Sequence, residues 1–368
     1  MENRKLITAI GLMSGTSMDG IDIALMQSDG RSIIRNKKFE FVPYDKGFKE
    51  KISYLIRSKP TLYEIKRIEN EFTMLNADSV NLFLLKNGID RSDVDLISFP
   101  GHTIFHDPQE SITWQIGNSD LLEAKTRIPV VTNFRTHDVA NNGQGAPLVP
   151  IYHFFMLKNL PKPYAVLNIG GVNNLTYVRN ESENDIVAFD ICFGNAPFDD
   201  LMAKFVGDDY DKGGKYSLAG NVNYEICSDI LKNEIFYISP PKSFDRDDFR
   251  RVLGRVQSLP LPDALASLSY IHSQAILTNI ELFLKEKPRA IYVCGGGVKN
   301  KAIMADLQKA MPDVEIKSTA AVGYNPDRIE AQAFAFIGIR KVLNLPISFQ
   351  KTTGISPETD FFPASFQY

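Results

Sequence analysis

The sequence predicts an α/β protein built from two similar halves. Runs rich in β-forming residues alternate with segments whose apolar residues recur at helical spacing, and the same order of elements occurs twice. A chain of 368 residues also has the length of about two domains. Because no low-complexity segment or charge run marks a flexible linker, we expect packed domains at residues 1–150 and 151–368, with ligands in a cleft between them.

The first half opens with a predicted β-hairpin. Its strands are residues 6–12 and 21–27, joined by a polar turn that contains glycines. A third strand is expected at residues 34–42, followed by a helical region that ends near Gly88. Residues 94–99 are then expected to form a strand that leads into a loop.

The second half repeats this order of elements. Three strands are followed by a helix, then by a long helix, a buried strand and two further helices. The expected ranges are strands 164–169, 175–178 and 186–191, helix 198–205, helix 262–285, strand 290–294, and helices 301–311 and 328–343.

Composition favours a small-molecule ligand. The net charge of −3 provides no broad basic surface for nucleic acid or an anionic membrane, and no apolar stretch approaches the roughly 20 residues of a membrane span. The N-terminal apolar run is too short for a signal peptide, and three cysteines form neither a disulfide framework nor a zinc cluster. We therefore expect a cytoplasmic protein. A homodimer is left open.

A glycine-bearing turn joins the first two strands within GLMSGTSMDGID, residues 11–22. Glycines let the backbone approach phosphates, hydroxyls and amides can donate to them, and carboxylates can hold Mg²⁺. The expected nucleotide-binding residues are Gly11, Ser14, Gly15, Thr16, Ser17, Met18, Asp19 and Gly20, with Asp19 or Asp22 on the metal. A plain polar hairpin turn is the alternative, and no Walker-type Gly-Lys-Ser/Thr follows.

Two further glycine motifs occur in the second half. LNIGGVNNLT lies in the corresponding hairpin, and VCGGGVKN lies where a strand runs into a helix. Either motif could also be an ordinary tight turn or bulge. The nucleotide-binding residues expected from them are Asn168, Gly170, Gly171, Gly295, Gly296, Gly297 and Asn300.

Taken with these motifs, nearly the entire chain resembles the anhydro-N-acetylmuramic acid kinase family of the sugar kinase and actin-like superfamily. The long run FRTHDVANNGQGAPLVP, residues 134–150, is too idiosyncratic for a chance match. Other matching runs are TIFHDP, WQIGNSDLLEAKTRIPVVTN, FD, GNA, PPKS and EAQAFA. The resemblance implies two ribonuclease-H-like domains that flank a nucleotide cleft.

The resemblance also implies an activity. The family uses ATP, Mg²⁺ and water to open 1,6-anhydro-N-acetylmuramic acid, forming N-acetylmuramate 6-phosphate and ADP in peptidoglycan recycling. By resemblance Asp190 is the base that activates water, although a strand-end aspartate can also cap a helix. The residues expected at the amino sugar are Arg135, Gln144, Gly145, Ala146, Asn195 and Glu330, and an ordinary ion pair is the alternative for Arg135.

Three departures from the family pattern leave other functions open. Ile191, Cys192 and Phe193 stand where the family usually has Thr-Gly-Pro, and the added bulk next to Asp190 could obstruct the site. FPGHT replaces Ser-His-Gly-Gln-Thr at residues 99–103, and FDR replaces Thr-Gly-Arg at residues 244–246. The alternatives are a nucleotide-binding scaffold that has lost turnover and a kinase for a different sugar.

Overall fold

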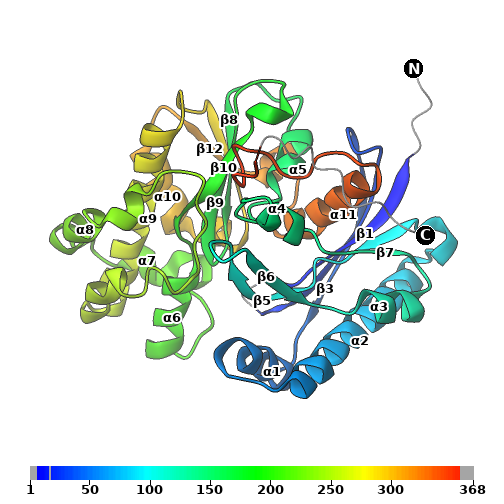
Figure 1. The fold of residues 1–368 in the computed structure, drawn as a ribbon. Coiled ribbons are helices and arrows are strands. Elements are labelled where there is room, and N and C mark those ends of the chain that lie inside the picture. The colour runs from blue at the N-terminus through cyan, green and yellow to red at the C-terminus, as the bar shows by residue number, and fades with distance from the viewer. Residues whose placement is uncertain (1–5, 16–17, 357–368) are drawn as a thin grey trace. The chain divides into compact units, whose positions relative to one another are not determined.

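The protein forms two compact units (Figure 1). The computed structural model describes residues 6–15 and 18–356, so the predictions for Thr16 and Ser17 lie outside the described residues. Unit 1 comprises the chain up to Leu157 together with the chain from Glu330 onward, and unit 2 comprises Lys158–Ile329.

Unit 1 is built on a five-stranded sheet with the order β3-β2-β1-β4-β7. Strands β1, β2 and β3 pair antiparallel, whereas β4 and β7 continue the sheet parallel to β1. The strands are β1 (Ile7–Met13), β2 (Gly20–Ser28), β3 (Ile33–Pro43), β4 (Leu96–Ser98) and β7 (Val130–Val131). A separate two-stranded sheet pairs β5 (His102–Asp107) with β6 (Ile112–Ile116).

The two faces of this sheet are covered by different helices (Figure 1). Ile10 and Leu12 belong to a core cluster that includes apolar residues of α1 (Lys46–Arg57) and α2 (Leu62–Asn87). Successive strand residues point to opposite faces, so Gly11 points the other way, toward α11 (Ile329–Val342). The remaining helices of unit 1 are α3 (Ser119–Thr126), α4 (Thr136–Ala140) and α5 (Pro150–Met156).

Unit 2 repeats the strand order and directions of unit 1. Its sheet runs β10-β9-β8-β11-β12, with an antiparallel β8-β9-β10 meander followed by parallel β11 and β12. The strands are β8 (Tyr164–Ile169), β9 (Val172–Val178), β10 (Val187–Phe193), β11 (Ala290–Cys294) and β12 (Glu315–Ser318). This repetition confirms the prediction of two similar α/β halves.

The helices of unit 2 lie beside its sheet (Figure 1). The long α9 contacts α6, α7, α8, α10 and strand β10, so it is the centre of the helical layer. The helices are α6 (Ala196–Phe205), α7 (Lys215–Ala219), α8 (Tyr224–Leu231), α9 (Leu261–Phe283) and α10 (Lys301–Ala310).

The chain returns to unit 1 in its last part, where we predicted a second domain running to residue 368. A Cβ placed on Gly11 would lie 2.0 Å from the carbonyl oxygen of Ala331, which shows how closely α11 packs on β1. Buried Arg340 of α11 donates to the carbonyl of Gly30 at 2.9 Å. Because α11 covers a face of the first sheet, it belongs to unit 1 although it follows unit 2 in sequence.

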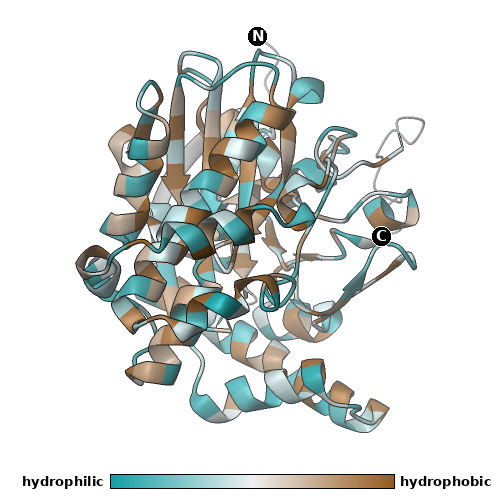
Figure 2. Ribbon diagram, turned by 90° about the vertical axis from the view of Figure 1, so that its left-hand side faces the viewer, coloured by the Kyte–Doolittle hydropathy of each residue, from teal (hydrophilic) through white to brown (hydrophobic). Residues whose placement is uncertain are grey.

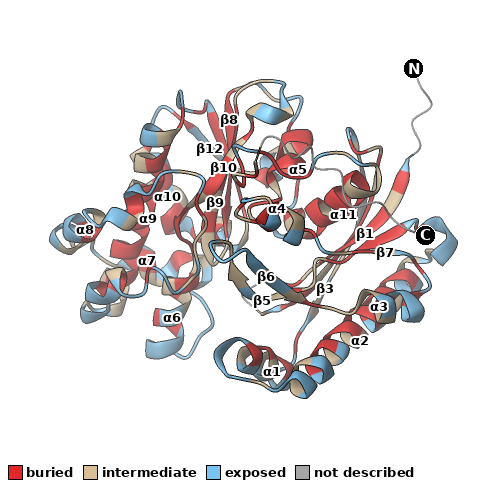
Figure 3. Ribbon diagram, viewed as in Figure 1, coloured by how far each residue is buried: buried red, intermediate tan, exposed pale blue. Residues whose placement is uncertain are grey.

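Burial follows the layers in both units. The sheet strands are mostly buried, whereas the helices alternate buried and exposed faces (Figure 3). Hydrophilic and hydrophobic residues alternate along the same surface helices (Figure 2). In the part of the chain that the structure describes, no helix is long and apolar enough to cross a membrane.

Candidate active site

The first hairpin turn is tethered by a buried chain of hydrogen bonds. Tyr44 donates its hydroxyl proton to Ser14 Oγ at 2.8 Å, and Ser14 Oγ lies 2.9 Å from Nδ1 of His102. The turn itself closes through a bond from the Met18 amide to the Gly15 carbonyl, at 3.0 Å. The Tyr44 amide also donates to the Asp19 carbonyl at 2.9 Å, so the turn is held from two elements.

Burial keeps these hydrogen-bonded side chains uncharged. Desolvation lowers the pKa of His102 to about 4, although a hydrogen bond with the backbone of Ser14 acts in the opposite direction. Burial likewise raises the pKa of Tyr44. A neutral His102 can accept the Ser14 hydroxyl proton at Nδ1 and carry its own proton on Nε2. We did not predict this role for His102 from the sequence, because Ser14 lies 88 positions away.

Asp19 and Asp22 are the carboxylates of this hairpin. Asp19 is exposed at the turn, and half-buried Asp22 lies on β2 opposite Met13. Among residues 6–15 and 18–356 no group of three or more metal-binding side chains occurs. Mg²⁺ in phosphoryl-transfer sites is commonly held by one or two carboxylates together with substrate phosphates, and the two aspartates of this hairpin are side chains of the kind that this chemistry uses.

Two glycines of the first motif have packing roles. A Cβ on Gly11 would meet the backbone of α11, and a Cβ on Gly20 would lie 2.3 Å from the carbonyl oxygen of Val42. Both positions therefore exclude any larger residue whether or not a nucleotide binds.

The second hairpin turn consists of Gly170 and Gly171, and its glycines face open space. A Cβ on Gly171 would meet no atom within 4 Å, so packing does not explain this glycine. The carbonyls of Gly170 and Gly171 accept the amides of Asn195 and Gly194 at 2.7 and 2.9 Å. The turn is thus docked on the segment that follows Asp190.

The third glycine run packs against the end of β8. Gly295 has a φ of 79°, and a Cβ there would lie 2.5 Å from Oδ1 of Asn168. A Cβ on Gly297 would lie 2.1 Å from the Ile169 side chain. Asn195 donates from Nδ2 to the Ile169 carbonyl at 3.1 Å. The structure therefore brings the predicted nucleotide residues of unit 2 together around one strand end.

Asn300 and the exposed Gly296 complete this group of predicted residues. The side chain of Asn300 caps α10, accepting the amides of Ala302 and Ile303 at 3.0 and 3.3 Å.

Asp190 lies on β10 at an irregularity in the strand. The register with β9 shifts between Asp190 and Cys192, which is a β-bulge that leaves the half-buried carboxylate oriented by its neighbours. Its Oδ2 accepts the Phe244 amide at 3.0 Å, and its own amide donates to the Lys242 carbonyl at 3.1 Å. Since α6 begins at Ala196 with Asn195 at the N-cap, Asp190 does not cap that helix.

The bulky residues after Asp190 point into the core. Ile191, Cys192 and Phe193 are each 0% exposed and belong to the main core cluster of unit 2. The Phe193 ring packs against Phe249 at a centroid distance of 5.8 Å. Burial raises the pKa of Cys192 to about 12, so its sulfur is a thiol. The departure from Thr-Gly-Pro is therefore accommodated by packing.

A second buried histidine lies beneath this segment. Asn173 Nδ2 donates to the Phe193 carbonyl at 2.7 Å and lies 2.6 Å from Nε2 of His272. Desolvation lowers the pKa of His272 to about 3, so the ring is neutral and can accept this bond. The histidine lies on α9, 99 positions from Asn173, which is why no local pattern reveals the pair.

The predicted sugar-binding loop of unit 1 is held through its backbone. Arg135 donates from Nη1 to the Gly145 carbonyl at 2.7 Å, and the Gly145 amide donates to Oδ1 of buried Asp138 at 2.7 Å. The Gln144 amide donates to the Thr353 carbonyl at 2.6 Å. Arg135, Gln144 and Gly145 therefore lie together, with half-buried Ala146 next in sequence.

Glu330 is half-buried in the first turn of α11.

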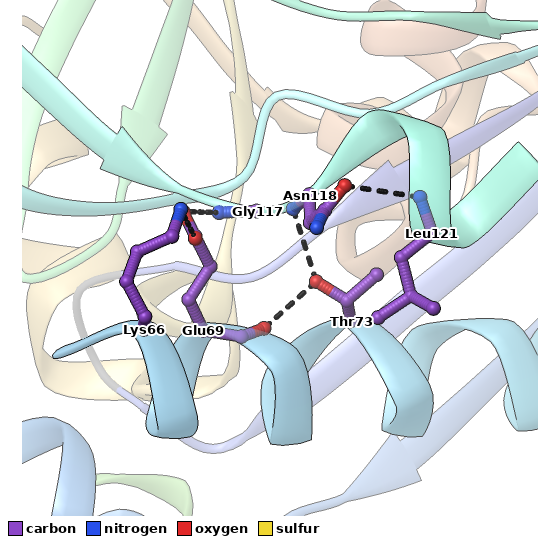
Figure 4. Close-up of polar contacts among 6 residues, drawn as sticks. All are labelled: Lys66, Glu69, Thr73, Gly117, Asn118 and Leu121. Carbon is purple, nitrogen blue, oxygen red and sulfur yellow. Dashed lines mark hydrogen bonds and ion pairs between the residues drawn. The ribbon is translucent and has the colours of Figure 1, made fainter. Parts of the chain in front are cut away.

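Another run of the family motif has a structural role. Glu69 and Thr73 of α2 accept the amides of Gly117 and Asn118 at 3.2 and 3.0 Å (Figure 4). Asn118 then caps α3 by accepting the Leu121 amide at 3.0 Å. The IGNSD segment is thus fixed to α2 and carries the start of α3.

The duplicated sheets, each opening with a hairpin and continuing with parallel strands, define a protein of the two-domain ribonuclease-H-like, actin-like class. The sequence profile of the family described as anhydro-N-acetylmuramic acid kinase matches residues 7–361. The chain belongs to this family.

Individual relatives match over almost their whole length. The anhydro-N-acetylmuramic acid kinase of Paramagnetospirillum magneticum is 37% identical, over 95% of this chain and 98% of the relative. Those of Nitrobacter winogradskyi and Zymomonas mobilis are 36% and 35% identical, covering 95% and 94% of this chain and 97% and 96% of the relatives.

Proposed function

We propose that this protein is an ATP-dependent kinase that hydrolytically opens 1,6-anhydro-N-acetylmuramic acid and phosphorylates its 6-oxygen, in peptidoglycan recycling. Family membership across residues 7–361 supports the substrate. The observation that carries the mechanism is Asp190, a half-buried carboxylate on a bulged strand whose orientation the Phe244 amide fixes. A positioned carboxylate can act as the general base that activates a water molecule.

In the proposed reaction Asp190 takes a proton from water as the water oxygen bonds to the anomeric carbon. The bond from that carbon to the 6-oxygen breaks, and the 6-oxygen receives the electron pair. This oxygen forms the new bond to the γ-phosphorus of ATP, the bond to the β-phosphate oxygen breaks, and ADP leaves. The hydrogen bond from Phe244 stabilises the ionised carboxylate that starts the sequence.

The nucleotide phosphates would bind at the glycine turns. Gly170 and Gly171 support this role because a Cβ there would meet open space or only a distant carbonyl, which leaves the backbone approachable. In the first hairpin we assign phosphate contacts to Ser14, Gly15 and the residues up to Asp19. Bound Mg²⁺ would neutralise charge on the transferring phosphoryl group, with Asp19 or Asp22 as its protein ligands.

The sugar would contact the loop that Arg135 and Asp138 hold. We assign substrate binding to Arg135, Gln144, Gly145 and Ala146 of unit 1, together with Asn195 and Glu330. A loop whose amides and carbonyls are already bonded presents its side chains in a fixed orientation, which favours binding of a rigid bicyclic sugar.

Asp190→Asn tests the proposal directly, because the change keeps the size of the side chain and removes its basicity. Turnover with the anhydro sugar should fall by roughly a hundredfold or more, with substrate binding retained. Coupled ADP release and phosphorus NMR of the product would measure this. Asp185→Asn, which alters a carboxylate just before β10, is the matched control and should keep wild-type turnover.

Equal turnover in Asp190→Asn and wild type would remove Asp190 from the mechanism. A wild-type protein that binds ATP without releasing ADP from any sugar would instead be a nucleotide-binding scaffold. Turnover restricted to another sugar would change the substrate assignment.

A further inference from the structure

Lys242 is a buried lysine whose position next to Asp190 the proposed mechanism does not yet use. Its side chain is in the core, with 5% of the residue exposed, and its Nζ donates to Oδ1 of Asn279 at 2.7 Å. Asn279 donates from Nδ2 to the carbonyls of Phe236 and Ala275, which fixes Oδ1 toward the lysine. Burying an ammonium group is costly, so this arrangement calls for a function.

Three aromatic rings complete the surroundings of the ammonium group. Nζ lies 5.5, 5.6 and 5.1 Å from the ring centroids of Phe189, Phe244 and Phe283. The negative faces of aromatic rings attract a cation, and this attraction is stronger where water is excluded. The protein thus keeps a positive charge in an apolar setting without a directly bonded carboxylate among the contacts the structure shows.

Phe244 and the backbone of Lys242 link the lysine to Asp190. Phe189 precedes Asp190 on β10, Phe244 donates its amide to the carboxylate, and the carbonyl of Lys242 accepts the Asp190 amide. Burial lowers the pKa of Lys242 to about 8, against the opposing effect of the Asp190 charge on β10. Arg246, the next cation along the segment, is turned away to Asp200 at 2.7 Å.

We propose that Lys242 is a positioning residue for Asp190, whose buried positive charge favours the ionised carboxylate and keeps it against the Phe244 amide. Lys242 does not touch the reacting atoms. It acts through Asp190, because the attraction between the two charges is reciprocal and stabilises the carboxylate as much as the ammonium. The inference rests on the proposed role of Asp190 as base.

The test removes the charge and follows the titration of Asp190. In Lys242→Met the carboxyl carbon signal of Asp190, in protein labelled with ¹³C at aspartate, should titrate about one pH unit higher than in wild type. The signal is assigned by its loss in Asp190→Asn. The acidic limb of kcat/KM should shift in the same direction, so the loss of turnover is greater at pH 6 than at pH 8.

Lys341→Met is the matched control. Lys341 has a pKa that burial also lowers to about 8, and its Nζ lies 5.1 Å from the Phe134 ring centroid, but its hydrogen bonds go to the carbonyls of Thr132 and Asn133 in unit 1. Its replacement should leave the Asp190 titration unchanged. If Lys242→Met does not fold, Lys242→Gln removes the charge while keeping a donor for Asn279.

An Asp190 titration that stays at its wild-type midpoint in a folded Lys242 variant would overturn the proposal. The NMR titration needs no substrate, so it decides the role of Lys242 even if the wild-type protein does not act on the anhydro sugar. Failure of the proposed function would appear separately, as wild type without ADP release.

Discussion

The two units share one topology but hold their hairpins differently. In unit 1 the turn between β1 and β2 is tied by one backbone bond, from Tyr44 to Asp19, and by side chains, with Ser14 bonded to Tyr44 and His102. In unit 2 the turn between β8 and β9 is tied by backbone bonds from Gly194 and Asn195, with Asn173 and His272 buried beneath. The strand order therefore determines where a turn lies, whereas the residues around it determine what holds the turn in place.

The two hairpins are held differently because different segments follow the third strand of each sheet, β10 in unit 2 and β3 in unit 1. Strand β10 continues into the segment 191–195, which docks on the second turn and carries Asp190 at its start. In unit 1 strand β3 ends at Pro43, and the next residue, Tyr44, reaches the first turn by both its amide and its hydroxyl group. In unit 2 the turn between β8 and β9 is therefore bonded directly to the segment that follows β10, the strand on which Asp190 lies.

The largest effect should come from restoring the family residues after Asp190. Cys192→Gly combined with Phe193→Pro removes a ring that packs on Phe198, Phe249 and His272, so the free energy of unfolding should fall by about 3–5 kcal/mol. Turnover should not rise, because the bulk lies in the core. Urea unfolding and ADP release would measure both, with Phe193→Leu as the milder control. A stable and faster double variant would show that the side chains obstruct the site.

Two alanine substitutions distinguish the backbone bonds that hold the second turn from the proposed approach of nucleotide to its exposed backbone. In Gly194→Ala the new Cβ would lie 2.1 Å from the Gly170 carbonyl oxygen, so the protein should lose about 1–3 kcal/mol of stability. Gly171→Ala meets no neighbour and should fold normally, but weaken magnesium-ATP binding if nucleotide approaches this backbone. Urea unfolding and calorimetry distinguish the two. Equal stability losses would contradict the backbone docking.

The buried histidines at the two hairpins, His102 and His272, predict a smaller, graded effect of acid. The pKa is about 4 for His102 and about 3 for His272, below the free value of 6.5. Below pH 6.5 the unfolded chain binds protons that the folded protein does not, so stability is lost as pH falls, by up to about 1.4 kcal/mol per pH unit for each histidine. His153, with a pKa near 3, adds to the same slope.

Replacing His102 in unit 1 or His272 in unit 2 tests how much each unit contributes to this loss of stability in acid. His102→Gln and His272→Gln should each reduce the acid slope by one histidine, and the His272 variant should differ from wild type down to a lower pH. Urea unfolding from pH 7.5 to about 3 measures the slopes and the pH at which each of them ends. A slope unchanged by both substitutions would mean that neither histidine is neutral in the folded protein.

The sequence predicts the parts of the fold that depend on local patterns. The strands and the long helices are visible from the spacing of apolar residues, and the turns of both hairpins from their glycines. The helical region ends near Gly88, as expected, because α2 ends at Asn87 with Gly88 as its left-handed cap. The sequence does not reveal contacts between distant positions. His102 and Ser14, His272 and Asn173, and Lys242 and Asn279 are paired only by the fold, so these buried polar pairs could not be predicted.

The two-domain organisation was predicted, but the return of the last helix to unit 1 was not, for the same reason. Residues 328–343 are recognisable as a helix, but only the close approach of Gly11 to Ala331 shows that this helix covers the first sheet. The candidate site residues were found from motifs, whereas their supporting partners, Phe244 for Asp190 and Asp138 for Gly145, required coordinates.

The return of α11 to unit 1 has a consequence for the order in which the protein is made. Synthesis proceeds from the N-terminus, and domains tend to fold as their chains emerge. Unit 2 is one continuous segment that is complete once Ile329 has left the ribosome. The face of β1 at Gly11, in contrast, is covered only after α11 has been synthesised, which follows unit 2 in sequence. The nascent first unit therefore exposes an unfinished sheet throughout translation of the second, which makes that interval the one in which a chaperone would be needed.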